Sequence, residues 1–116
     1  MVSWGLLTTQ SPPDTNFVAI AAGSSHSLAL RKDGTVAAWG FNSDGQSTPP
    51  FHLTGVVAIA AGSFHSVALR NDGSIVVWGD NSYGQHTAPT DARFIAIAAG
   101  GDHSLALRSD GTITGW

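Results

Sequence analysis

Short apolar segments, separated by glycine-rich turns, run along most of the chain. Val18–Ala22 is apolar at every position, and His26–Arg31 alternates Leu28 and Leu30 with smaller residues. A short unbroken apolar run is typical of a strand buried on both faces, and alternation is typical of a strand with two different faces. A third segment, Thr35–Trp39, follows an Asp-Gly pair, which favours a tight hairpin turn. This order predicts three antiparallel strands, and no segment has the apolar period of a helix.

The same unit occurs three times. Phe17–Gly40 recurs as Val56–Gly79 and again as Phe94–Trp116. The repeated histidines are His26, His65 and His103, and the repeated tryptophans are Trp39, Trp78 and Trp116. Internal repetition at this period indicates stacked supersecondary units. We therefore divide the chain into residues 1–16, a partial repeat with an outer strand and a connector, and three blade repeats over residues 17–55, 56–93 and 94–116, the last with strands only.

One such unit is too small to bury two apolar faces by itself. Sheets stacked face to face can bury them, and small residues such as Ala29 opposite large ones such as Leu28 let neighbouring sheets interlock. Radial stacking also limits exposed sheet edges. The predicted fold is therefore all-β, a β-propeller segment with three blades of three antiparallel strands, completed to a ring by oligomerisation. The alternative, a β-helix, has shorter rungs and lacks a regular Asp-Gly hairpin.

Composition narrows the function. The chain has 14 glycines, 11% charged residues and a net charge of −3. Five scattered cations do not form the clustered basic face that nucleic acid requires, so we expect no nucleic-acid partner. No apolar run approaches the roughly 20 residues of a membrane span, and the N-terminal residues lack a signal-peptide pattern, so we expect no membrane association. Disulfides are excluded because there is no cysteine, and the cellular location stays open.

Three residue types invite a chemical role, and each has a structural explanation. The repeated histidines occupy equivalent, mutually distant places around a ring, so we predict hydrogen bonds to backbone or to a neighbouring blade rather than a metal site. The tryptophans are predicted to be packing anchors rather than a ligand platform. Turn geometry explains the aspartates of the Asp-Gly pairs. We therefore predict no catalytic residue, no metal and no cofactor, and we expect that the chain is not an enzyme.

The motif AIAAG-x-x-HS-x-AL-x-x-DG, followed by WG-x-N-x-x-GQ, resembles the repeats of the regulator of chromosome condensation family. The resemblance covers residues 17–116 and, more loosely, the N-terminal segment. It implies a β-propeller, commonly of seven blades. The short spacing is more similar to the short-repeat type that includes beta-lactamase inhibitor protein II, whose blades have three strands. The nucleotide-exchange activity of the family's namesake is not implied, because it depends on insertions and a partner surface that have no counterpart in this compact sequence.

Variation among the repeats is concentrated in two loops. One lies just before the repeated histidine, and the other follows the Trp-Gly pair. A repeat scaffold leaves its loops free to vary, so binding specificity is expected there. Aromatic side chains dominate interface hot spots, which favours Phe64 and Tyr83 as anchors. The candidate partner-binding residues are Phe64, Tyr83, Asp102, Asn42, Asp44 and Asn81.

The leading hypothesis is a non-catalytic repeat scaffold that self-assembles into a closed β-propeller and binds a protein partner through these loops. One alternative is a natural or engineered propeller fragment whose only activity is self-assembly. Another is a glycan-binding, lectin-like propeller. That alternative calls for similar aromatic and polar pockets in every blade, whereas the loops of this chain differ from one repeat to the next.

Self-assembly is expected because a three-blade arc leaves an apolar sheet face open at each end. Head-to-tail packing of two copies gives six blades and of three copies gives nine, and we expect the homodimer because six is nearer to the common blade number. Val2-Ser3-Trp4 repeats the third-strand pattern, although Thr114-Gly115-Trp116 already supplies that strand to the last blade. We therefore expect one terminal segment to be displaced, or the N-terminal strand to clasp the partner chain.

Overall fold

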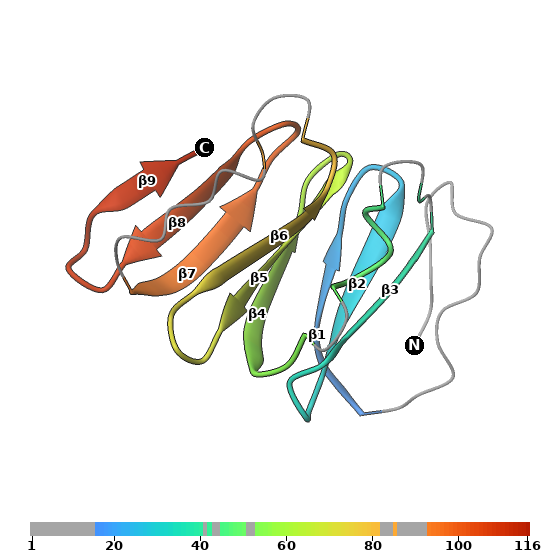
Figure 1. Ribbon diagram of the computed structural model, residues 1–116, viewed down its shortest axis with the longest axis horizontal. Coiled ribbons are helices and arrows are strands. Elements are labelled where there is room, and N and C mark those ends of the chain that lie inside the picture. The colour runs from blue at the N-terminus through green and yellow to red at the C-terminus, as the bar shows by residue number, and fades with distance from the viewer. Residues whose placement is uncertain (1–15, 41, 43–44, 51–52, 82–84, 86–92) are drawn as a thin grey trace.

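The computed structural model describes residues 16–40, 42, 45–50, 53–81, 85 and 93–116. In this part of the chain, three separate antiparallel sheets each consist of three consecutive strands (Figure 1). Blade 1 contains β1 (Phe17–Ala22), β2 (His26–Arg31) and β3 (Val36–Gly40). Blade 2 contains β4 (Val56–Ala61), β5 (His65–Arg70) and β6 (Ile75–Gly79). Blade 3 contains β7 (Phe94–Ala99), β8 (Ser104–Arg108) and β9 (Ile113–Gly115). The predicted all-β fold with three blades of three antiparallel strands is confirmed.

The first strand of each blade differs from its prediction. The apolar run was expected to be buried on both faces, but β1, β4 and β7 are edge strands of their sheets. The pairing of β1 with β2 shifts register between Phe17 and Ala19, and the same shift occurs in the other blades. The residues at this bulge, Val18, Val57 and Ile95, are all more than half exposed. An unbroken apolar run therefore did not distinguish a buried strand from an edge strand with a bulge.

The Asp-Gly pairs form the hairpins between the second and third strands, as predicted. Asp33 Oδ1 accepts hydrogen bonds from the Thr35 amide at 3.0 Å and from the Thr35 hydroxyl at 2.6 Å. Gly34 has a φ of +86°, a conformation that favours glycine. The turn takes up residue 35, so β3 begins at Val36, one residue later than predicted, and ends at Gly40. Blades 2 and 3 repeat this geometry at Asp72 and Asp110.

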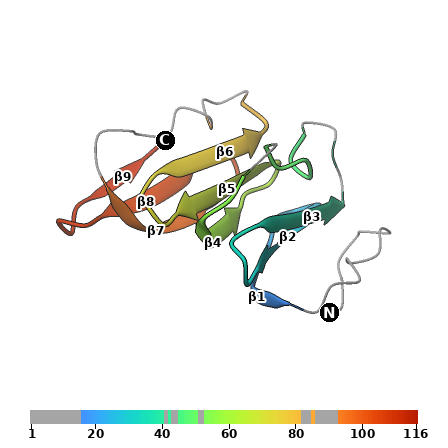
Figure 2. The ribbon, with the colours of Figure 1, turned by 60° about the horizontal axis from the view of Figure 1, so that its bottom comes forward.

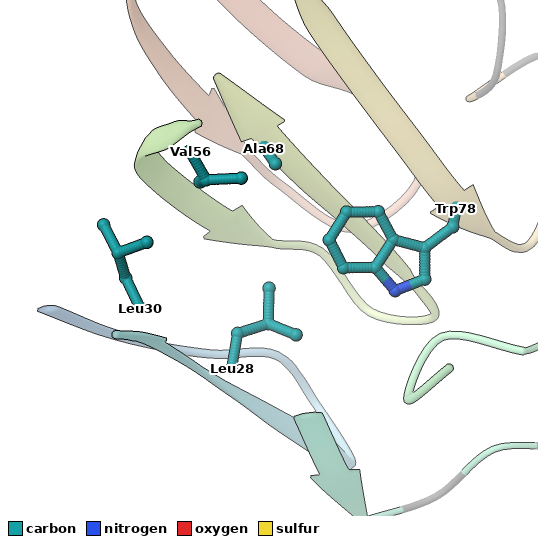
Figure 3. Close-up of a cluster of buried hydrophobic side chains, with 5 residues drawn as sticks. All are labelled: Leu28, Leu30, Val56, Ala68 and Trp78. Atoms are coloured by element: carbon teal, nitrogen blue, oxygen red, sulfur yellow. The ribbon is translucent and has the colours of Figure 1, made fainter. Parts of the chain in front are cut away.

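Alternation along the strands gives every blade two different faces. The leucine face of a blade holds, in blade 1, Ala21, Leu28, Leu30 and Val36, and the tryptophan face holds Ile20, Ala29 and Trp39. The tryptophan face of blade 2 packs on the leucine face of blade 1 (Figure 3). The buried side chains of that contact are Leu28, Leu30, Val56, Ala68 and Trp78.

Blades 2 and 3 pack in the same way. Leu69 of the blade 2 leucine face contacts Phe94 and Ala106 of blade 3, with Ile97 and Trp116 packed against them. The middle sheet therefore lies between the other two, which both views show (Figures 1 and 2). Most of the hydrophobic core of the described chain lies in these two junctions, and each is built by side chains from two blades. Ala29, Ala37 and Trp39 on the tryptophan face of blade 1 are buried as well. The described residues contain no helix that could cross a membrane.

Candidate functional site

The repeated histidines join neighbouring blades. His26 Nε2 of blade 1 lies 3.0 Å from Ser66 Oγ of blade 2, and His65 Nε2 of blade 2 lies 2.9 Å from Ser104 Oγ of blade 3. All four side chains are buried. The histidine extends from the leucine face of one blade, and the serine belongs to the tryptophan face of the next. The prediction that the histidines bond to a neighbouring blade is confirmed at these two positions.

The hydrogen bonds around Ser66 define the protonation state of His26. The Ser66 hydroxyl donates to the Gln46 carbonyl oxygen at 2.9 Å, so its oxygen accepts the Nε2–H of His26. Burial lowers the pKa of His26 from 6.5 to about 4, because the charged imidazolium would lose its hydration. His26 is therefore neutral near pH 7, with its proton on Nε2.

Gln46 has a role that the sequence interpretation missed. It is fully buried in the connector after blade 1, and its backbone carbonyl accepts both the Ser66 hydroxyl and the Trp78 indole N–H, the latter at 3.0 Å. The Gln85 carbonyl accepts the Trp116 indole N–H at 2.6 Å. The recurrence of Gly-Gln in both connectors was the available signal for this role.

Trp39 and Trp78 are packing anchors, as the sequence predicted. Trp39 and Trp78 are buried, and Trp78 completes the cluster between blades 1 and 2. The Trp39 indole N–H is buried and has no hydrogen-bond acceptor in the described part of the chain. Among the described residues, Trp39 therefore lacks the connector carbonyl that accepts the indole N–H of Trp78 and of Trp116.

The glycine of the Ala-Ala-Gly motif is required by close contact between blades. A Cβ on Gly62 would collide with the ring of its own His65 and with the Gly100 carbonyl of blade 3. A Cβ on Gly23 would likewise collide with the His26 ring and with the Gly62 carbonyl of blade 2. Glycine at this position lets the loops before the histidines of successive blades touch.

These loops form one continuous edge, which we call the loop rim: residues 23–25, 62–64 and 100–102. Ser24 Oγ donates to Ser63 Oγ at 3.2 Å, and the Ser63 amide donates to the Gly101 carbonyl at 3.0 Å. Phe64 lies in the middle loop with 36% of its side chain exposed. The loop rim therefore carries different side chains from three blades on a shared backbone framework.

The predicted binding residues lie near the loop rim or in the connectors. Asp102 is exposed in the third loop of the rim, where the Gln85 amide donates to it at 3.5 Å and to Asp80 at 3.0 Å. Exposed Asn81 directly follows Asp80, whose amide donates to the Phe64 carbonyl at 2.9 Å. The structure thus brings the segment around Asn81 to Phe64 and Asp102.

Asn42 is exposed in its own connector, where its amide donates to Thr48 Oγ1 at 2.8 Å and its carbonyl oxygen accepts the Ser47 amide at 2.8 Å. Asn42 therefore closes a local turn. Asp44 and Tyr83 lie outside the described residues. Their candidacy stays a prediction.

The turn aspartates are exposed and have a structural explanation. Hydrogen bonds from the side chain and amide of Thr35 lower the pKa of Asp33, and equivalent bonds lower the pKa of Asp72 and of Asp110. Each carboxylate is thus held ionised by its own turn. Among the described residues, no group of three histidine, aspartate or glutamate side chains could hold a metal ion.

Three similar sheets stack leucine face to tryptophan face, and edge strand β4 contacts both β1 and β7. This arrangement defines an arc of a β-propeller. The profile of the Regulator of chromosome condensation (RCC1) repeat matches residues 17–46, 56–85 and 94–116. The chain therefore belongs to the RCC1 repeat family, whose propeller fold is non-catalytic in general. No curated protein sequence matches the chain.

Solved structures agree with this class. The chain is similar to the ectodomain of the Physcomitrella patens receptor kinase CR4, with 27% identity, a TM-score of 0.79, and coverage of 96% of this chain and 33% of that one. It is also similar to Prp20p from Saccharomyces cerevisiae, with 30% identity, a TM-score of 0.77, and coverage of 92% of this chain and 32% of that one. For human WBSCR16, whose identity of 23% supports the fold alone, the TM-score is 0.77 and the coverage is 93% and 34%. The chain spans about a third of the length of these structures.

Proposed function

We propose that the chain is a non-catalytic scaffold that self-assembles into a closed β-propeller and binds a protein partner through its loop rim. The observation that carries the proposal is the construction of the loop rim. Its three loops are joined by hydrogen bonds between blades, while their exposed side chains differ. A rigid framework with variable side chains suits recognition of another macromolecule.

The chemistry of the rim favours a protein as the partner. Phe64 offers an aromatic anchor, and Asp102 and Asn81 are exposed polar residues in the neighbouring segments. An aromatic centre with a polar periphery is the usual arrangement of a protein interface. Among the similar proteins, yeast Prp20p binds Gsp1p and histones, so protein binding occurs on a related propeller.

Self-assembly is supported by what the ends of the arc expose. Leu105 and Ile113 on the leucine face of blade 3 are 45% and 67% exposed, and Ile20 on the tryptophan face of blade 1 is 54% exposed. Apolar faces of this kind are normally covered by a partner. A homodimer would bring six blades together, and a trimer would bring nine.

Binding through the rim is tested with three versions of the purified chain as bait in a lysate of the source organism. The wild type is compared with the double variant Phe64→Ala/Asp102→Ala and with Lys32→Ala, an exposed control in the hairpin at the opposite end of the strands. We expect proteins that the wild type and Lys32→Ala retain and the rim variant loses. An identical set of proteins on all three baits would contradict the role of the rim.

Self-assembly is tested separately by light scattering on the purified chain. A homodimer has twice the 11.9 kDa mass of one chain, about 24 kDa. A mass of one chain at micromolar concentration, together with cooperative unfolding, would contradict self-assembly and leave the rim proposal standing.

A further inference from the structure

The chain contains the same junction twice, and each junction has three recurring contacts. The first is the histidine–serine hydrogen bond between blades. The second joins the hairpin glycine of one blade to the start of the next: the Val56 amide donates to the Gly34 carbonyl at 3.0 Å, and the Phe94 amide donates to the Gly73 carbonyl at 3.1 Å. The third is the packing of a tryptophan face on a leucine face.

Blade 3 carries the first half of a third junction, and no second half packs on it among the described residues. His103 is exposed, whereas the equivalent His26 and His65 are buried. Gly111, the hairpin glycine, has no neighbouring atom within 4 Å of an added Cβ among the described residues, whereas Gly34 and Gly73 each contact the segment that leads into the following blade. The leucine face forms a shallow apolar hollow of about 140 Å³. Its lining residues are Ala96, Ile97, Ala98, Leu105, Ala106, Leu107 and Ile113.

Blade 1 carries the complementary half. Ile20 is 54% exposed, whereas the equivalent Ile59 and Ile97 pack into the two junctions. Ala29 and Trp39 of the same face are buried, so the exposed part of this face is the region around Ile20. Ser27 occupies the position of Ser66 and Ser104, but it has no histidine partner in the described part of the chain. Phe17 occupies the position of Val56 and Phe94, and its amide meets no hairpin carbonyl among the described residues.

We propose that a second copy of this chain docks the tryptophan face of its blade 1 on the leucine face of blade 3, so that His103 bonds to the second copy's Ser27 and the Gly111 carbonyl accepts that copy's Phe17 amide. This inference rests on the proposed self-assembly and specifies its surface. The occupant is a second copy because one chain carries both halves of the contact. The same two kinds of face already pack together at the two junctions within the chain.

Donors and acceptors favour this head-to-tail pairing over contact between two identical faces. Two leucine faces would offer no serine hydroxyl to either His103 ring, because Ser104 lies on the opposite face of the blade. Two tryptophan faces would give Ser27 no histidine partner and leave both His103 rings in water. Only unlike faces satisfy the histidine, the serine and the hairpin carbonyl together, and buried polar groups are normally satisfied. Head-to-tail contacts close into a ring when the rotation permits.

The test uses one aspartate on each face, Leu105→Asp and Ile20→Asp. Both side chains are about half exposed in the single chain, so both variants are expected to fold. Each aspartate would be buried without a partner in the docked junction, which should weaken association at least about 100-fold. Val57→Asp is the matched control, because Val57 is 55% exposed although its blade is packed on both sides. Circular dichroism checks the fold of each variant.

Mixing the variants identifies the faces. Leu105→Asp and Ile20→Asp should each sediment as single chains at a concentration where wild type and Val57→Asp associate. Their mixture should form a heterodimer, because Leu105 of one variant still meets Ile20 of the other. Should either variant misfold, Ile113→Asp or Ala22→Asp replaces it on the same face.

Each other outcome overturns the inference. An assembly that persists in Leu105→Asp would place the interface elsewhere while leaving self-assembly intact. Loss of association only in Leu105→Asp would indicate contact between two leucine faces. Two variants that remain single chains when mixed would also contradict head-to-tail docking. A wild-type chain that does not associate would overturn the proposed self-assembly itself.

Discussion

The middle blade and the C-terminal blade have nearly the same sequence, but equivalent side chains differ in their exposure. His65 and Val67 of blade 2 are fully buried. Their equivalents in blade 3, His103 and Leu105, are exposed, Leu105 to 45%. Local sequence cannot explain this difference, because both blades carry the same His-Ser-x-Ala-Leu strand and the same Asp-Gly hairpin.

The difference arises from the neighbours. Blade 2 packs on both faces, and blade 3 packs on one face only within the described part of the chain. In a repeat protein, stability resides largely in the contacts between adjacent units, so an end unit lacks part of it. The following predictions compare a residue at a filled junction with its equivalent at an open face.

The largest expected effect is at the tryptophan of the first junction. Trp78→Ala should lower the free energy of unfolding by about 3–5 kcal/mol, because it deletes a large buried side chain. Trp116→Ala should cost less, since Trp116 is only partly buried at the end of the chain. Chemical denaturation of both variants measures the difference. Equal losses, or a Trp78 variant of unchanged stability, would contradict the assignment of Trp78 as the anchor.

The next effect concerns the histidines. His65→Ala leaves the buried Ser104 hydroxyl without its partner, which should cost about 2–3 kcal/mol. His103→Ala, made in the Leu105→Asp background so that both faces stay open, should change stability by less than about 0.5 kcal/mol. Denaturation curves in urea compare the two substitutions. A loss at His103 as large as that at His65 would mean that His103 stabilises its blade without a neighbouring blade.

A pH effect follows from the buried histidine of the first junction. The pKa of His26 is lowered from 6.5 to about 4, so between these two values the unfolded chain binds more protons than the folded chain. Stability should therefore fall as the pH drops through this range, with a slope of at most about 1.4 kcal/mol per pH unit from this residue. His26→Gln should flatten the curve of unfolding free energy against pH. The same slope in that variant would contradict a neutral, buried His26.

The smallest expected effect is beside the filled junction. Phe64→Ala should change the free energy of unfolding by less than about 0.5 kcal/mol, because Phe64 lies on the exposed loop rim next to buried His65. Thermal unfolding measures this directly. A substantial loss would assign Phe64 to the core and remove the aromatic anchor proposed for partner binding.

The sequence predicted the repeat, the hairpins and the three-stranded blades, because these depend on local spacing and turn residues such as Asp33 and Gly34. It could not predict the exposure of the first strands, because the bulge at Val18 arises from pairing with the next strand rather than from composition. The sequence also could not predict that the Gln46 carbonyl accepts two hydrogen bonds from blade 2. A backbone acceptor has no side-chain signature, and its two donors come from the following blade.

The candidate site was predictable only in outline. Variation between repeats located the loops around Phe64 and Asp102, and the structure brings these loops together. The histidines show the limit of that approach. Their repetition indicated a structural role, but the choice of Ser66 as partner of His26 depends on which face of one sheet meets which face of the next.

The central claim is that a second copy supplies the neighbour that the leucine face of blade 3 and the Ile20 region of blade 1 lack in the described part of the chain. Hydrogen exchange of the Phe17 amide tests it most directly, because the equivalent amides of Val56 and Phe94 bond to hairpin carbonyls. In the associated wild-type chain, the Phe17 amide should exchange as slowly as those of Val56 and Phe94, and it should become fast in Leu105→Asp. A Phe17 amide that exchanges fast in the associated wild type would contradict the claim.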